Sequence, residues 1–170
     1  MIVRITKITN FIHIFVYMAP SAKYNDLAVF KSLLSKYGLR QTSQRLAVHR
    51  AMMRLIHASA DEVCTEIRKE GMVSVTTASV YNILNGLSEK GIYAKRMCSS
   101  GKLYFDIRPT PHAHFYDTKN DALFDVTDEK IQQKADSILA RRRTTGYHLD
   151  AVEIYILCHP TGRKKKAPKA

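Results

Sequence analysis

Residues 76–91 carry the sequence TTASVYNILNGLSEKG, which predicts an amphipathic helix with a signal at each end. Thr76 or Thr77 can cap its N-terminus, and Gly91 can end it in the left-handed conformation that glycine adopts readily. The apolar side chains recur at the spacing of one helix face: Val80, Ile83, Leu84 and Leu87. Short polar and flat side chains are left near the N-terminus of the other face, as in a helix that enters the major groove of DNA.

The flanking sequence predicts three more helices and a hairpin around this segment. The upstream helices follow from apolar spacing and end signals, and they cover about 27–38, 42–56 and 59–71. In the third, Ser59 and Glu62 form a capping-box pattern. Downstream, residues 92–97 and 102–107 are predicted to be strands joined by a tight turn. Helices followed by a hairpin are typical of a winged helix-turn-helix.

A second block, at about residues 108–160, predicts a small unit of mixed structure. Residues 114–126 indicate two short strands, 128–143 an amphipathic helix, and 150–157 a further strand. A unit of this size is marginally stable alone, so we expect it to dimerise. The predicted fold class is therefore α+β. A winged helix-turn-helix domain is expected at 25–105 and a small C-terminal α/β dimerisation domain at 106–160.

The two ends of the chain are predicted to lie outside these domains. Residues 1–24 form an N-terminal extension in which Met18 is the expected natural start, so that 1–17 would not be native; a signal peptide is the alternative. The apolar run at 11–17 is too short to span a bilayer, and no membrane partner is expected. The basic tail at 161–170 is expected to be disordered, either simply solvated or adding loose phosphate contacts.

Charge and cysteine content indicate the partner and the compartment. The chain of 170 residues has 27 Lys and Arg against 15 Asp and Glu, a formal charge of +12. This excess predicts an anionic partner, most simply double-stranded DNA. Three cysteines without a CxxC pair exclude a disulfide framework and fit the reducing cytoplasm.

Polar and basic residues at two helix starts are the candidates for DNA contact. Those on the 76–91 helix can reach base edges or phosphates, and those near residue 42 suit phosphate or minor-groove contact. The alternative is an ordinary surface helix, since such residues are common there. The candidates are Arg40, Gln44, Arg45, Thr77, Ser79, Tyr81 and Asn82.

Five residues drawn from both predicted domains could hold one divalent metal per protomer: His57, Asp106, His112, His114 and Asp125. Imidazole and carboxylate together suit Zn²⁺, Fe²⁺ or Mn²⁺ rather than Ca²⁺ or Mg²⁺. A lone histidine is more often a surface or core residue than a ligand, so the combination carries the prediction. A site shared by two domains can link metal occupancy to the angle between them.

Five motifs, in this order, resemble the ferric uptake regulator family of bacterial metalloregulators. They are GLRQTSQR (38–45), HASADEV (57–63), TASVYNILNGLSEKGI (77–92), GKLYFD (101–106) and HAHF (112–115). The resemblance covers about residues 27–158. It implies a dimeric, metal-controlled DNA-binding protein in which Arg40 reaches the minor groove and Tyr81 the major groove of an inverted-repeat operator.

The resemblance also implies the regulatory site, whose ligand positions fall on the five residues named above. Their spacing is most similar to that of the peroxide-sensing branch. In that branch, bound iron promotes oxidation of the histidines at the positions matching His57 and His112. Most members carry a structural zinc in two CxxC pairs. Here Asp117 and Asn120 stand in place of the first pair and the second is missing near Cys158, so no structural zinc held by four cysteines is expected. Ala113 and Val152 stand where an accessory site often has ligands.

The predicted function is therefore a sequence-specific transcriptional regulator under divalent-metal control, serving iron homeostasis or a peroxide response. The alternative is a constitutive or haem-responsive regulator whose single metal is structural. A metallohydrolase is the least favoured interpretation, and no enzyme is expected. No separate general base stands beside the cluster, and no glycine loop that could cradle phosphate occurs.

Overall fold

The computed structural model describes residues 26–141, 143–144, 146–149 and 151–161. The expectations for residues 1–24, including the start at Met18, and for the tail beyond residue 161 lie outside these residues. In chain order the elements are α1 (Leu27–Lys36), α2 (Ser43–Leu55), β1 (His57–Ala58), α3 (Ala60–Glu70), α4 (Thr77–Glu89), β2 (Ala94–Met97), β3 (Leu103–Asp106), β4 (His114–Asp117), β5 (Ala122–Asp125), α5 (Glu129–Leu139), β6 (Arg143–Thr144), β7 (Tyr147–His148) and β8 (Tyr155–Cys158).

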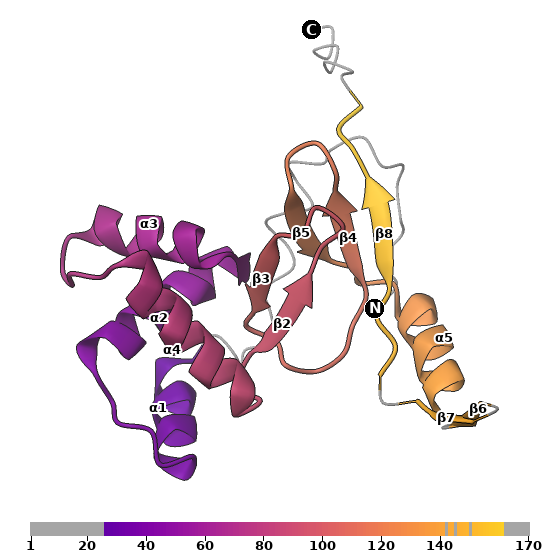
Figure 1. The fold of residues 1–170 in the computed structure, drawn as a ribbon, viewed down its shortest axis with the longest axis horizontal. Coiled ribbons are helices and arrows are strands. Elements are labelled where there is room, and N and C mark those ends of the chain that lie inside the picture. The colour runs from indigo at the N-terminus through magenta and orange to yellow at the C-terminus, as the bar shows by residue number, and fades with distance from the viewer. Residues whose placement is uncertain (1–25, 142, 145, 150, 162–170) are drawn as a thin grey trace, which may run out of the picture.

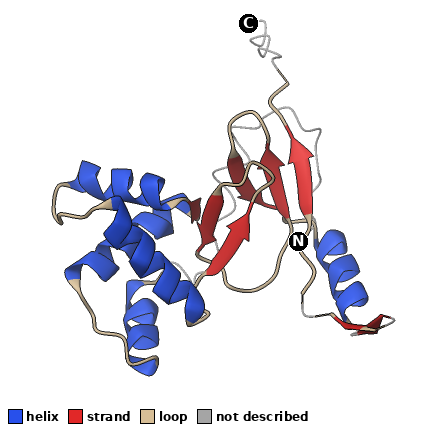
Figure 2. Cartoon of the chain, viewed as in Figure 1, coloured by secondary structure: helices blue, strands red, loops and turns tan. Residues whose placement is uncertain are grey.

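The two halves of the chain occupy opposite ends of the molecule. Helices α1 to α4 gather at one end, and the hairpin β2–β3 lies between them and the sheet that contains β4, β5 and β8 (Figure 1). Helix α5 and the short pair β6–β7 lie at the far end. Figure 2 shows the same division by element type, with helices α1 to α4 beside the hairpin β2–β3. Among the described residues, no helix is long and apolar enough to cross a membrane.

Helices α2, α3 and α4 begin where their capping residues predict. The Thr42 hydroxyl accepts a hydrogen bond from the Arg45 backbone at the start of α2. Ser59 and Glu62 form a complete capping box at the start of α3, and Gly71 ends that helix in the left-handed conformation with φ 68°. Such caps satisfy backbone groups that a helix leaves unpaired at its ends. The local signals therefore place these helices within a few residues.

One core holds the helical half together and extends into the wing, which is the hairpin β2–β3. The inner faces of α1, α2, α3 and α4 pack around side chains with no exposed surface, among them Leu34, Val48, Met52 and Leu84. Phe105 of β3 is also fully buried in this core. The wing is therefore part of the same folded body as the four helices.

The first sheet contains a strand that was not predicted. β3 lies between β1 and β2, and both neighbours run antiparallel to it. β1 has only two residues, too few to show the alternation that predicts a strand. Its register nevertheless sets His57 opposite Asp106. The hairpin strands are one or two residues shorter at their ends than the predicted 92–97 and 102–107.

The second sheet differs more from the sequence-based expectation. β4 lies between β5, antiparallel to it, and β8, parallel to it. The helix predicted at 128–143 ends at Leu139, because the chain turns back through Gly146 and pairs β6 with β7. The strand predicted at 150–157 begins only at Tyr155, where pairing with β4 starts. These differences arise from strand pairing, which local spacing does not encode.

A second buried cluster joins the wing to the second sheet. It contains Cys98 and Tyr104 from the wing side and Tyr116 and Leu123 from β4 and β5. The Tyr104 hydroxyl also donates a hydrogen bond to the Asp121 carbonyl in the β4–β5 turn. The two halves thus share an apolar contact in addition to the linker between β3 and β4.

A buried histidine in the first core makes stability depend on pH. The His49 ring stacks on Phe30 at 3.9 Å between centroids, and its Nδ1 lies 2.7 Å from the Tyr93 hydroxyl. Burial lowers the pKa of His49 to about 4, against opposing contributions from Asp26. The unfolded chain binds a proton near pH 6.5 that the folded protein does not bind until about pH 4. Stability is therefore lost as the pH falls from 6.5 towards 4.

We expect this histidine to cost about 3 kcal/mol of unfolding free energy at pH 4 relative to pH 7, at about 1.4 kcal/mol per pKa unit. Urea unfolding of the metal-free protein at several pH values measures the loss. The His49→Gln variant, which cannot titrate, should lose less stability over the same range. Equal pH dependence in the two proteins would contradict the assignment.

Candidate metal centre and DNA-reading helix

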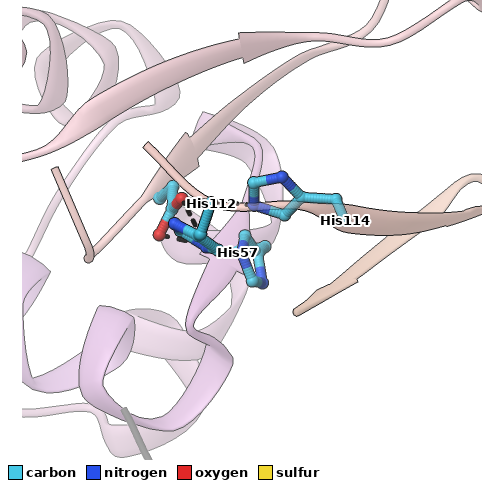
Figure 3. A group of neighbouring side chains, drawn as sticks. His57, His112 and His114 are labelled. Atoms are coloured by element: carbon cyan, nitrogen blue, oxygen red, sulfur yellow. Dashed lines mark ion pairs between the residues drawn. The ribbon is translucent and has the colours of Figure 1, made fainter. Parts of the chain in front are cut away.

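Two strand pairs and a linker bring the five predicted ligand residues together. The β1–β3 register sets His57 opposite Asp106, and the β4–β5 register sets His114 opposite Asp125. His112 lies on the segment that joins β3 to β4. Figure 3 shows the three histidines gathered in one small region, although they come from β1, the linker and β4. Each sheet therefore supplies one histidine and one carboxylate.

The donor atoms lie close enough to surround a single ion. Asp125 Oδ1 is 2.9 Å from Nε2 of both His57 and His112, and 3.9 Å from Nε2 of His114. Asp106 Oδ2 is 3.4 Å from Nε2 of both His112 and His114. One donor atom from each of His57, Asp106, His112 and His114 lies within 4.8 Å of the other three.

Several of these atoms are buried without a hydrogen-bond partner among the described residues. They are His57 Nε2, His114 Nε2 and Asp106 Oδ2, whose contacts with one another and with Asp125 are ion-pair contacts only. A buried polar atom without a hydrogen bond costs about 1–3 kcal/mol, and a cation shared by all three atoms would offset that cost. The donor set therefore fits a divalent metal ion.

A hydrogen bond to Thr110 orients the His112 ring towards the cluster. Its Nδ1 lies 2.8 Å from the Thr110 carbonyl, which can only accept, so Nδ1 carries the proton. The ring then presents Nε2 to the Asp125 carboxylate, 2.9 Å away. Fixing the tautomer through the other ring nitrogen is a common feature of histidine ligands.

The pKa shifts of Asp106, Asp125 and His114 favour the forms that bind metal. Burial alone would raise the pKa of Asp106 and Asp125. Contacts with the surrounding histidines reverse this and hold the pKa of both carboxyls below the usual range. Burial lowers the pKa of His114, which favours its neutral form. Ionised carboxylates and neutral imidazoles are the forms that bind metal.

Two arginines beside the cluster were not predicted. Arg108 places its guanidinium 2.7 Å from Asp125 Oδ2, and its backbone nitrogen donates to Asp106 Oδ1 at 2.8 Å. Arg96, on β2, lies 3.6 Å from Asp106 Oδ2 and 3.1 Å from Glu153. Basic residues are frequent in this chain, and no spacing rule marks the two that approach the carboxylates.

The predicted DNA-contacting residues divide into two groups. Arg40, Tyr81 and Asn82 are exposed, and Tyr81 keeps 43% of its surface accessible with its ring edge-on to Phe105. Thr77 is half-buried in the first turn of α4. These side chains lie at or near the N-terminal ends of the helices expected to approach DNA.

The other three candidates make hydrogen bonds within the protein. Ser79 completes a capping box with Thr76 at the start of α4. The Gln44 side chain donates to the Ser74 carbonyl at 3.1 Å, and Arg45 donates to the Arg40 carbonyl. These contacts give each of the three a structural role that was not predicted.

The β4–β5 turn is closed by hydrogen bonds at the position where the family resemblance places a cysteine pair. The Asp117 carboxylate accepts from the backbone nitrogens of Lys119 and Asn120, and from the Asn120 side chain at 2.7 Å. The Thr118 nitrogen and hydroxyl both donate to the Cys158 carbonyl. Polar side chains therefore connect the turn to β8.

The fold and the cluster together define a class: DNA-binding proteins in which a winged helix and a second α/β unit meet at a candidate metal centre. The model of the ferric uptake regulator family matches residues 36–157. The chain therefore belongs to the ferric uptake regulator family. Its members are dimeric DNA-binding transcription regulators controlled by metal, and the predictions of family, fold class and general function are confirmed.

Individual relatives support the same assignment. The ferric uptake regulation protein of Haemophilus influenzae is 30% identical over 105 residues, which span 60% of this chain and 71% of that protein. The crystal structure of the Vibrio cholerae ferric uptake regulator shares the fold with a TM-score of 0.63 and 22% identity, covering 77% of this chain and 99% of that one. The Campylobacter jejuni peroxide stress regulator gives 0.56 and 25%, covering 81% and 98%.

Proposed function

We propose that this regulator holds one divalent metal at His57, Asp106, His112, His114 and Asp125, and that the metal controls its affinity for an inverted-repeat operator. The observation that carries the proposal is the buried histidine–carboxylate cluster. It draws donors from both sheets, and three of its buried polar atoms make no hydrogen bond among the described residues. Zn²⁺ and Fe²⁺ suit these donors, and Mn²⁺ is also compatible with them.

The proposed control follows from where each ligand is anchored. His57 and Asp106 belong to the sheet of the winged-helix half, whereas His114 and Asp125 belong to the second sheet. A bound metal supplies positive charge that both pairs can share, and this favours one orientation of the two sheets. A ten-thousandfold change in the population ratio of two orientations requires about 5.5 kcal/mol of difference in metal-binding free energy between them. A well-formed metal site can supply this difference.

DNA recognition in the proposal uses two copies of the chain. Dimerisation through the second α/β unit would place one α4 helix in each of two successive major-groove faces, which matches an inverted repeat. Arg40 would reach phosphate or the minor groove, while Tyr81 and Asn82 would contact base edges. We propose the cytoplasm as the location, where such DNA is found. Iron supply and peroxide are the two signals compatible with this donor set.

A second candidate is favoured by the apolar cluster between the wing and the second sheet. Cys98, Tyr104, Tyr116 and Leu123 bury one another without help from a metal. If this contact alone fixed the orientation of the two halves, the metal would stabilise the fold and DNA binding would be constitutive. Comparing DNA binding before and after removal of the metal separates the two candidates.

The proposed contact of Tyr81 with base edges gives a direct test of the DNA-binding surface. The Tyr81→Ala variant is expected to bind the operator about tenfold more weakly or worse, since a good base contact contributes roughly 1–3 kcal/mol. Metal content should remain that of the wild type, because Tyr81 is on α4 and outside the cluster. Tyr37→Ala is the matched control, because Tyr37 is another exposed tyrosine, at the end of α1.

Binding at fixed salt concentration to the operator and to a scrambled duplex measures this effect. The loss in Tyr81→Ala should be larger for the operator than for the scrambled duplex. Equal loss on both duplexes would assign Tyr81 to phosphate contact, and no loss would remove it from the interface.

A further inference from the structure

Both carboxylates of the candidate metal centre already have a cation of the protein beside them. Arg108 Nη1 lies 2.7 Å from Asp125 Oδ2, and Arg96 Nε lies 3.6 Å from Asp106 Oδ2. Guanidinium groups stay charged at every pH that a protein tolerates. Each carboxylate therefore has a cationic partner even without a metal ion.

The contact between Arg108 and Asp125 divides the two oxygens of one carboxylate. Oδ2 faces the guanidinium, while Oδ1 faces the imidazole nitrogens of His57 and His112, each 2.9 Å away. Asp125 can therefore bind an ion through Oδ1 and keep its pair with Arg108. In that state the guanidinium and the metal ion draw on the same negative charge.

Arg108 could strengthen metal binding by holding Asp125 in place, or weaken it by withdrawing charge. Pairing of β4 with β5 already holds the Asp125 backbone opposite His114 whether or not Arg108 is present, so we expect the first effect to be the smaller one. The second effect remains whenever both cations are near one carboxylate. The Arg108 side chain is 28% exposed, so solvent screens the repulsion without removing it.

We propose that Arg108 is an internal competitor cation that shares Asp125 with the metal and so raises the metal concentration at which the site fills. This inference rests on the proposed function, because it concerns the metal affinity of that same site. Arg108 weakens the binding of every divalent ion through the same charge. The order of metal affinities is therefore set by the histidines and carboxylates. Metals that bind this donor set weakly are then the ones excluded at low concentration.

The test is metal affinity in the Arg108→Gln variant, which removes the charge and leaves a shorter polar side chain. Dissociation constants for Zn²⁺ and Mn²⁺ are measured by competition with a chelator at fixed pH and salt. We expect both metals to bind about tenfold more tightly than to the wild type, equivalent to about 1.4 kcal/mol. The metal-free variant should also unfold at a lower temperature, because Asp125 loses its partner.

Two controls separate charge from geometry. Lys130→Gln removes the charge of an exposed lysine on α5 that makes no ion pair with either carboxylate in the described part of the chain, and its affinities should match the wild type. Arg108→Lys keeps the charge but loses the planar fork, and it should stay within about threefold of the wild type. A tenfold gain in Arg108→Lys would place the effect in geometry and overturn the proposal.

The remaining outcomes are also decisive. If Arg108→Gln binds metal as well as the wild type, or less well, the competitor role is wrong and the proposed metal site stands. If the wild type and all variants bind neither metal, the proposed function fails, and the competitor role fails with it. The unfolding temperatures without metal provide a readout that does not depend on DNA binding.

Discussion

Replacing His112 with alanine is expected to abolish the metal response of DNA binding while leaving the fold intact. His112 Nε2 lies 2.9 Å from Asp125 and 3.4 Å from Asp106, and the hydrogen bond from Nδ1 to Thr110 holds Nε2 towards the cluster. We expect metal affinity to fall at least a hundredfold, about 2.7 kcal/mol. Operator affinity with metal should then equal that of the metal-free wild type.

The fold should tolerate this change because His112 lies on the linker between β3 and β4 and belongs to neither apolar cluster. His159→Ala is the control, since it makes the same substitution at an exposed position beyond β8. Chelator competition measures metal affinity, and circular dichroism checks the fold. A folded His112→Ala protein whose operator binding still rises with metal would contradict the proposed switch.

Replacing Tyr104 with alanine is expected to give the largest loss of stability, about 3–5 kcal/mol, as for other large buried aromatic side chains. Tyr104 is 2% exposed and packs in the cluster that joins the wing to the second sheet. Its hydroxyl donates to the Asp121 carbonyl, and the Lys102 ammonium lies 4.6 Å from its ring centroid. The substitution therefore removes packing, a hydrogen bond and a cation–π contact together.

Urea unfolding of the metal-free protein measures this loss. Met97→Ala, on the same wing but 60% exposed, should change the unfolding free energy by no more than about 0.5 kcal/mol. Hydrogen exchange in β2 and β3 should also become faster in Tyr104→Ala, because the wing loses its contact with the second sheet. A loss below about 1 kcal/mol would show that the two halves do not share a core.

The helical half could be predicted from the sequence because its signals are local. Thr42, Ser59 and Thr76 cap the helices that follow them, and Gly71 ends α3, each within a few residues of the group it satisfies. β1 escaped prediction because two residues carry no alternation. The predicted end of α5, at residue 143, was wrong. The helix ends at Leu139, because the residues that follow form the β6–β7 pair, which is not local to the helix.

The candidate site was predictable as a set of residues but not as an arrangement. The family resemblance named the five ligand positions, and the pairing of β1 with β3 and of β4 with β5 brings them together. Neither Arg108 nor Arg96 could be foreseen, because ion pairs between distant segments have no characteristic spacing. The capping role of Ser79 was also missed, although the pair Thr76 and Ser79 carries the spacing of a capping box.

The central claim is that metal at this cluster controls DNA binding, and one titration tests it most directly. The protein is stripped with a chelator, and its binding to an inverted-repeat duplex selected from a random pool is followed by fluorescence anisotropy at fixed salt. Fe²⁺, Mn²⁺ or Zn²⁺ is then added back. The account predicts that operator affinity rises tenfold or more, at least about 1.4 kcal/mol, with one or more of these metals. A stripped protein that stays folded and binds the duplex equally well would contradict it.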